Sequence, residues 1–309
     1  MKVFLKSILF ISLFSGLILS CDKIDEPFPP NIEIIDSSIV WDDSIFSNSN
    51  DNVRFVLMEE FTGHTCPNCP DAAVEVERFR NVKYGAKFIP IAIHATETFA
   101  APKDLTGAPA GSYQTDHRTD ESLDYENESS FGIGKGLPRA LISRRGESVT
   151  VGKWVQKCDK IYENPGPTLA NIHITNFFDD SSKTFRVRIR IEWLEDYAGG
   201  MNLQIQVRED NIVDWQLDGS DHIEDYLFDH MFRGSVNGAW GSPISAASAG
   251  EITEISFTQS IENYLGRERK YSLDNYEKSD FSDWSMIAFI YKDSPEFEVM
   301  QVNEAHLTN

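Results

Sequence analysis

The sequence has few basic residues and, beyond its amino terminus, no long apolar run. Lysine and arginine number 28 against 49 acidic residues, for a formal net charge of −21, which argues against binding to nucleic acid or docking on anionic lipid. No stretch after residue 20 approaches the roughly 18 apolar residues that a membrane crossing needs. No acidic loop has the ligand spacing of a calcium site, no internal repeat is present, and no cofactor is predicted.

The composition is that of a folded protein. Of 309 residues, 41% are hydrophobic and 25% are charged, as in ordinary globular chains. This length is sufficient for two domains with cores of their own.

The first twenty residues have the layout of a secretory signal peptide. Lys2 and Lys6 precede an apolar run over 8–19, and this order of charge and apolar residues predicts a signal peptide over 1–20. The end of the run, ILSC, looks like a lipobox, in which the cysteine is acylated. We therefore expect Cys21 to be lipidated and to anchor the protein to a membrane. The two alternatives are a soluble secreted protein that is cleaved nearby and an uncleaved membrane anchor.

Residues 21–52 are acidic, contain three prolines and end in a polar run, so they predict a tether. After it, VRFVLMEEF and KFIPIAIHA are short apolar runs typical of buried strands. Between them, Ala73, Val76 and Phe79 recur near helical spacing. Strand, helix and strand at this length predict a βαβ unit with parallel strands.

The rest of 53–165 predicts an insertion, a strand and a helix. Residues 96–131 are rich in small and acidic residues and are expected to be partly helical and partly loop. GLPRALI predicts a strand, and KWVQKCDKIYENP predicts a helix that buries Cys158 as a free thiol.

From 166 to 309 the pattern changes to alternation, most clearly in TFRVRIRIEWL, where every second residue is apolar. We expect an all-β antiparallel sandwich, Ig-like or jelly-roll-like, joined to the first domain near residue 166. Residues 221–241 interrupt the alternation with aromatics, histidines and glycines, and are interpreted as a loop that covers an open end of the core.

Cys66 and Cys69 have the spacing of a redox pair. At a helix start, this spacing exposes one thiol and holds the other a short reach behind it. Backbone amides at the helix N-terminus stabilise a thiolate there. If the pair reacts, Cys66 is expected to attack and Cys69 to resolve the mixed disulfide.

Three other residues are expected near this pair. Glu60 lies in the strand before it and could take the proton of Cys69. Pro138 opens a later strand, where a cis bond would bring a backbone edge beside the thiols for an extended substrate. His94 ends the second strand at the same carboxyl edge, where sites in parallel sheets form.

Together these elements resemble the thioredoxin fold over 53–165. The run EEFTGHTCPNCP, with IPIAIHA, GLPRALI and DHMFRGSVNGAWG, is similar to the outer membrane protein 28-related (Omp28-related) family of lipoproteins. The likeness is greatest at the cysteine motif and smaller in the sandwich. It implies an outer-membrane lipoprotein on the periplasmic or surface face, with envelope or surface proteins as partners and a role described as adhesin or receptor.

The chemistry of the cysteine pair has three interpretations. It exchanges disulfides, or it is a permanent disulfide in a non-enzymatic binding or adhesin-type protein, which is common in exported proteins. A third interpretation is a copper or zinc site in which His64 or His94 joins the two cysteines, although a second cysteine pair is missing. Reversible reduction would distinguish the first from the second.

Overall fold

The computed structural model describes residues 52–264 and 281–307. The signal peptide predicted over 1–20, Cys21 and all but the last residue of the tether predicted over 21–52 lie outside the described residues. Within the described part of the chain, every helix is too short or too polar to cross a bilayer.

Three strands at the amino-terminal end of the described chain form one edge of a mixed sheet. They are β1 (Val56–Thr62), β2 (Phe88–His94) and β3 (Arg139–Ile142). Strand β1 is parallel to β2 and antiparallel to β3, so the predicted βαβ unit is confirmed. All seven residues of β1 are buried, because elements cover the sheet on both faces.

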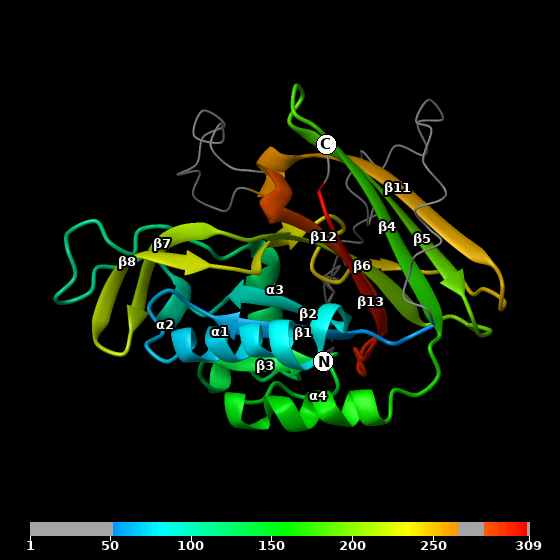
Figure 1. Ribbon diagram of the computed structural model, residues 1–309, viewed down its shortest axis with the longest axis horizontal. Helices are drawn as coiled ribbons and strands as arrows, with labels where there is room; N and C mark the ends of the chain where they lie inside the picture. Colours follow the sequence, from blue (N-terminus) through cyan, green and yellow to red (C-terminus); the bar gives the residue numbers. More distant parts are fainter. Residues whose placement is uncertain (1–51, 265–280, 308–309) are drawn as a thin grey trace, which may run out of the picture.

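Helices cover one face of this edge (Figure 1). They are α1 (Cys69–Arg78), which continues as a π-helix over Phe79–Lys83, and α4 (Trp154–Glu163). Pro70 stands in the first turn of α1, where its missing N–H costs no hydrogen bond. Val76 and Phe79 face the core as predicted, but the third buried residue is Ala72 and not Ala73, which is only partly buried.

The predicted insertion over 96–131 contains two short helices, α2 (Glu97–Ala100) and α3 (Asp120–Asn127), separated by loop. Tyr125 and Phe131 from this segment enter the core on the other face of the sheet. Short 3-10 turns lie at Gly85–Lys87, Ile133–Lys135, Val151–Lys153, Ile261–Tyr264 and Phe281–Asp283.

The carboxyl-terminal region forms two antiparallel layers. One is the three-stranded sheet of β4 (Ala170–Asp179), β5 (Thr184–Trp193) and β11 (Ile252–Ser260). The other contains β6 (Met201–Glu209), β12 (Trp284–Lys292) and β13 (Val299–His306). Their apolar side chains meet in one core, and β5 buries every second residue as its alternation predicts. The structure thus has an α/β part followed by a β-sandwich.

The two parts share a sheet, which the sequence pattern did not indicate. Strand β9 (Met231–Ser235) pairs with β6 on one side and with β2 on the other, and gives the order β13-β12-β6-β9-β2-β1-β3. The link to β2 is short, with one residue pair between Ala92 and Met231. A further short strand, β10 (Ser242–Pro243), pairs with β6.

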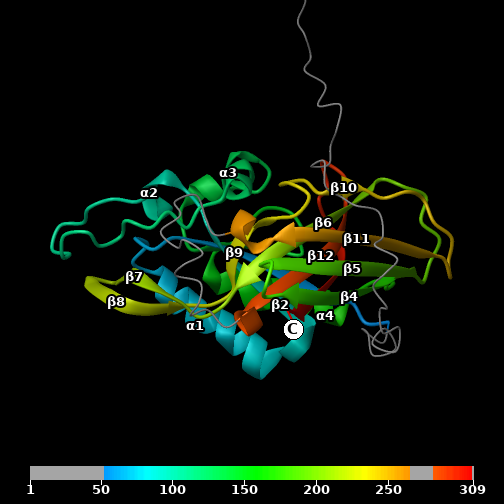
Figure 2. The same cartoon turned by 90° about the horizontal axis from the view of Figure 1, so that it is seen from above.

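The interpretation of 221–241 as a loop is wrong. Most of the segment is strand: β8 (Asp221–Phe228) pairs with β7 (Ile212–Asp218) in a separate hairpin, and β9 follows. The sequence pattern did not predict strand β8, because the strand is partly or fully exposed along nearly its whole length and therefore has no alternation of apolar and polar residues. The β7–β8 hairpin lies at the end of the molecule where α1 begins (Figures 1 and 2).

Candidate functional site

Cys66 and Cys69 lie in the turn that connects β1 to α1, and Cys69 is the first residue of the helix. They form a disulfide with a Cα–Cα distance of 5.5 Å. The amide of Cys66 donates to the carbonyl of Gly63 at 2.9 Å, and the amide of Cys69 donates to the carbonyl of Cys66 at 3.2 Å. The pair therefore stands at a helix start, as predicted.

The expectation of one exposed thiol is wrong. Cys66 is 1% exposed and Cys69 is 3% exposed. The β7–β8 hairpin covers the turn: the amide of Leu217 donates to the carbonyl of His64 at 2.9 Å, and the side chain of Gln216 donates to the carbonyl of Cys66 at 3.1 Å. A segment about 150 residues away in sequence thus shields the disulfide, which no local pattern could indicate.

Gly63 is required by close packing on the other side of the turn. A Cβ atom at this position would lie 2.4 Å from the carbonyl oxygen of Phe99. The same oxygen accepts from the amide of Thr65 at 3.0 Å and from its hydroxyl at 2.9 Å. The insertion over 96–131 therefore fixes the cysteine turn directly.

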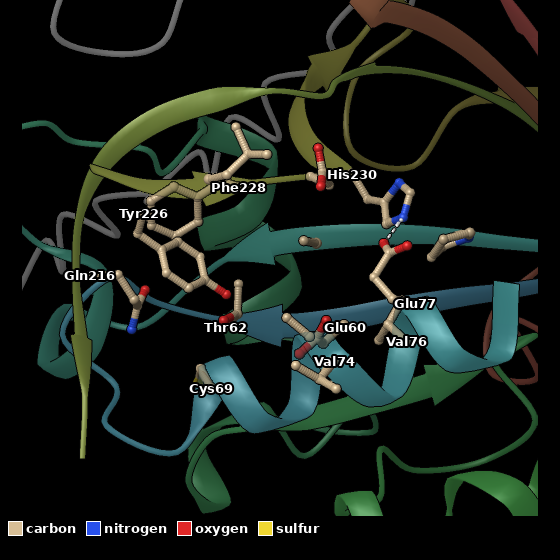
Figure 3. Close-up of a pocket in the computed structure, with 15 residues that line it drawn as sticks. Glu60, Thr62, Cys69, Val74, Val76, Glu77, Gln216, Tyr226, Phe228 and His230 are labelled. Carbon is tan, nitrogen blue, oxygen red and sulfur yellow. Dashed lines mark hydrogen bonds and ion pairs between the residues drawn. The ribbon is translucent and has the colours of Figure 1, made fainter. Parts of the chain in front are cut away.

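Glu60 is buried behind the pair, as predicted. Its side chain lines the same cavity as Cys69, and one carboxyl oxygen has no hydrogen-bond partner (Figure 3). Burial raises the pKa of Glu60 to about 8, a shift that the charge of His230 only partly offsets. A pKa of about 8 favours the protonated carboxyl near neutral pH, in the cavity that Cys69 also lines.

The cavity has a volume of about 210 Å³ and is largely apolar. Helix α1, strands β1, β2, β7 and β8, and the loop after β8 form its walls (Figure 3). At its edge, His230 forms a 2.8 Å contact with Glu77 and a 3.1 Å contact with Asp210. Although burial lowers the pKa of His230, the hydrogen bonds to Asp210 and Glu77 raise it above its ordinary value.

His94 lies beside the cysteine turn but does not line this cavity. It is buried with His64 and His117, at ring-centre distances of 6.3 and 5.1 Å. Both of its ring nitrogens lack a hydrogen-bond partner, and burial together with the two neighbouring histidines holds its pKa well below the usual range. His94 is therefore neutral.

The other two histidines of this cluster are also shifted toward the neutral form. Burial lowers the pKa of His64 to about 4, and burial lowers that of His117 despite its 3.1 Å contact with Asp214. Within the described residues, no three histidine, cysteine or acidic side chains are arranged to hold a metal ion.

Pro138 precedes β3, and its peptide bond with Leu137 is cis. Strands β1 and β3 pair Glu60 with Ala140 and Phe61 with Arg139. Pro138 comes directly before Arg139, so it lies at the end of β1 that leads into the cysteine turn. The sequence therefore placed this residue at the correct end of the sheet.

Cys158 is the remaining cysteine of the described chain. It is fully buried on α4 as a free thiol, and burial raises its pKa to about 12. The prediction of a buried free thiol is confirmed.

Comparison with known proteins identifies the family. The model described as outer membrane protein Omp28 matches residues 126–309, more than half of the chain. The chain belongs to the Omp28 family. The family name points to the outer membrane or envelope. The matched segment begins after Cys66 and Cys69, although the sequence suggested the greatest likeness at that motif, so family membership by itself carries no information on the pair.

Solved structures similar to this Omp28 family member include HBP35 of Porphyromonas gingivalis. That likeness has a TM-score of 0.56 at 13% identity and covers 82% of this chain and 75% of that one, which supports the fold. A GH3 beta-glucosidase of Bifidobacterium adolescentis gives a TM-score of 0.22 at 16% identity, over 45% of this chain and 17% of that one, which is too small to support an argument. No curated protein matches the chain.

Several residues around the cysteine turn and the cavity were not predicted from the sequence. Gln216 and Leu217 contact the cysteine turn, His117 joins His94, and Tyr226 lines the cavity. None lies in a motif, and nothing in the spacing of 214–228 indicated that it folds back onto 63–69. Only the tertiary structure brings these segments together.

Proposed function

We propose that this Omp28 family member is a lipid-anchored envelope protein that exchanges disulfides through Cys66 and Cys69. One observation carries the proposal: a neutral, buried carboxyl, that of Glu60, lines the same cavity as Cys69 and has an oxygen without a partner. A disulfide that only fastens a loop does not need such a group, and burying it costs stability. Strongly shifted carboxyls of this kind gather at functional sites.

The topology supports a thioredoxin-like assignment for 53–165. Strand β1 pairs with a parallel and an antiparallel neighbour, and the disulfide follows β1 at the start of α1. Pro138 opens β3 after a cis bond, and α4 follows β3. The assignment gives Pro138 the role of presenting a backbone edge to an extended substrate.

The exchange step balances as follows when a substrate dithiol reduces the pair. One substrate thiolate forms a bond to Sγ of Cys66 and breaks the Cys66–Cys69 bond. The electron pair of that bond passes to Sγ of Cys69, which takes the proton of Glu60. The second substrate thiolate then attacks the substrate sulfur of the mixed disulfide and releases Cys66 as a thiolate. The substrate loses two electrons, and the cysteine pair gains them.

In the opposite direction, Cys66 attacks a substrate disulfide, and Cys69 resolves the mixed disulfide while Glu60 receives its proton. His94 lies outside the cavity that Glu60 and Cys69 share, so it transfers no proton in this scheme.

A second function is favoured by a different observation. Both cysteines are almost completely buried, as in a permanent disulfide. In that case the protein is a non-enzymatic surface binding protein of the adhesin type, and Cys66–Cys69 stabilises the turn beneath the hairpin.

The reduction potential of the pair separates the two functions. It is read by mass-shift alkylation across a glutathione series, with Cys21→Ala/Cys158→Ala as the background so that only Cys66 and Cys69 react. A potential between about −300 and −120 mV supports exchange and justifies trapping envelope partners with Cys69→Ser. A potential well below about −300 mV overturns exchange and leaves the binding function.

Anchoring through Cys21 has its own test. Cells that express the protein are labelled with a radioactive or clickable fatty acid, and their membranes are fractionated. Label on the wild-type protein and none on Cys21→Ala supports lipidation. An unlabelled wild-type protein overturns it, whatever the potential of the cysteine pair.

A further inference from the structure

The β7–β8 hairpin is a two-stranded sheet of its own. In the described part of the chain, β7 and β8 pair only with each other, so no sheet hydrogen bonds join them to the large sheet. At the base, Ile212 and Phe228 pack with Met231 in a small apolar cluster. Val213 and Leu227, which pair across the hairpin, are 54% and 48% exposed. The hairpin thus packs its base and one face against the rest of the protein and leaves the other face exposed: Asp214 and Gln216 on the packed face are 8% and 1% exposed, and Asp214 lies 3.1 Å from His117 of the insertion.

Its tip is fastened to the cysteine turn by three hydrogen bonds to three carbonyl oxygens. The amides of Leu217 and Gly219 donate to His64 and Pro67, each at 2.9 Å. The side-chain amide of Gln216 donates to Cys66 at 3.1 Å. These acceptors are the first cysteine and residues on both sides of it, and two of the three donors are backbone amides, which a polypeptide strand laid along the turn would also supply.

A second set of contacts joins the hairpin to the insertion over 96–131. The Tyr113 hydroxyl lies 2.9 Å from Nδ1 of His222 on β8. The Tyr113 ring also lies 5.7 Å from that of His64 and 5.9 Å from that of Trp215. Tyr113 therefore connects the hairpin to the cysteine turn and is itself 1% exposed.

The chemistry of exchange conflicts with this closed arrangement. A thiolate attacks a disulfide sulfur directly, so the attacked sulfur must be reachable. Cys66 is 1% exposed beneath the hairpin, whereas exchange as proposed above begins at Cys66. The tip must leave before reaction, and its departure frees the carbonyl oxygens of His64 and Pro67.

We propose that the β7–β8 hairpin is a lid that gates the disulfide, and that an extended polypeptide substrate displaces its tip by donating its own amides to the freed carbonyls of His64 and Pro67. The inference rests on the proposed exchange function and names its regulation and its substrate class. A small thiol has no backbone amides and cannot replace these hydrogen bonds, so it must wait for spontaneous opening.

Gating is tested by the rate at which dithiothreitol reduces the pair in the same Cys21→Ala/Cys158→Ala background. Gln216→Ala removes one tip contact and should speed reduction roughly 5-fold, since a hydrogen bond of this kind is worth about 1 kcal/mol. Adding Tyr113→Phe, which removes the contact with His222, should speed it further. Glu224→Ala, an exposed change on the same hairpin, is the matched control and should leave the rate unchanged.

The reduction potential is measured on the same variants, because a lid accelerates both directions and leaves the equilibrium nearly unchanged. Equal rates in wild type, Gln216→Ala and the double variant overturn the gate. A potential that marks a permanent disulfide overturns the exchange function, while the rates still report whether the hairpin limits access. Far-ultraviolet circular dichroism and unfolding curves show that each variant is folded.

The substrate class is tested with two synthetic ten-residue peptides that carry the same cysteine pair. One has ordinary amides, and the other is N-methylated at the residues flanking the cysteines. The ordinary peptide should reduce the wild-type pair at least 5-fold faster, and the difference should shrink in Gln216→Ala/Tyr113→Phe. Equal rates for the two peptides on the wild-type protein overturn strand pairing at the turn.

Discussion

Arg144 donates two hydrogen bonds, of 2.8 and 2.6 Å, to the carboxylate of Glu59 in a place that water does not reach. The two side chains are 0% and 1% exposed. The guanidinium also lies 5.0 to 5.4 Å from the centres of four aromatic rings, those of Tyr125, Phe131, Phe289 and Tyr291. This ion pair connects β1, the strand that also carries Glu60, to the turn after β3.

Breaking this pair should destabilise the fold strongly. Arg144→Met leaves the Glu59 carboxylate buried without its partner, which costs about 3–5 kcal/mol in urea unfolding. The double variant Glu59→Leu/Arg144→Met should recover most of that loss, because both charges are gone. Arg78→Met, which removes the exposed pair with Glu75, is the control and should leave the midpoint near wild type. A single variant as stable as wild type would contradict the buried ion pair.

Glu60 should make stability fall as the pH rises. Its folded pKa of about 8 lies above the ordinary value of 4.5, so between these pH values the unfolded chain releases a proton that the folded chain keeps. The free energy of unfolding therefore declines by up to about 1.4 kcal/mol per pH unit in this window. Urea unfolding of wild type and Glu60→Gln from pH 5 to 8 gives the difference. If the free energy of unfolding depended on pH equally in wild type and Glu60→Gln, the carboxyl of Glu60 would be ionised in the folded protein.

His94 should have the opposite dependence on pH. Its folded pKa is lowered, so below about pH 6.5 the unfolded chain binds a proton that buried His94 does not, and acid destabilises the fold. His94→Leu removes this loss. It should also stabilise the protein at pH 7.5 by about 1–3 kcal/mol, because two unpartnered nitrogens disappear. The rate of disulfide exchange should stay within 2-fold. A much slower disulfide exchange in His94→Leu would show that His94 takes part in the reaction.

Gly63 should tolerate no side chain. Gly63→Ala places a methyl group 2.4 Å from the Phe99 carbonyl oxygen, so the cysteine turn or α2 must move, at a cost of about 1–3 kcal/mol. Gly134→Ala, where a methyl group meets nothing within 4 Å, is the matched control. Thermal or urea unfolding of both variants checks the prediction. Equal stability of the two would mean that the turn is not packed against Phe99.

Local sequence patterns predicted the strands and helices near the cysteines, because each of these patterns indicates one kind of local structure. The apolar runs around Glu60 and His94 are short and continuous, as buried parallel strands require. The spacing of Cys66 and Cys69 placed them at a helix start, and the apolar face of α4 placed Cys158 in the core. These features depend on residues within a few positions of one another, so the sequence alone was sufficient.

What the sequence by itself determined is therefore the set of elements, the family resemblance and the residues that carry the candidate chemistry. Only the tertiary structure decided the exposure of Cys66, the histidine neighbours of His94 and the sheet that joins both parts through β9. The reason is that the hydrogen bonds of Gln216 and Leu217 to the cysteine turn join residues about 150 positions apart. Such contacts arise when the packed cores bring the hairpin and the turn together, and no local spacing encodes them.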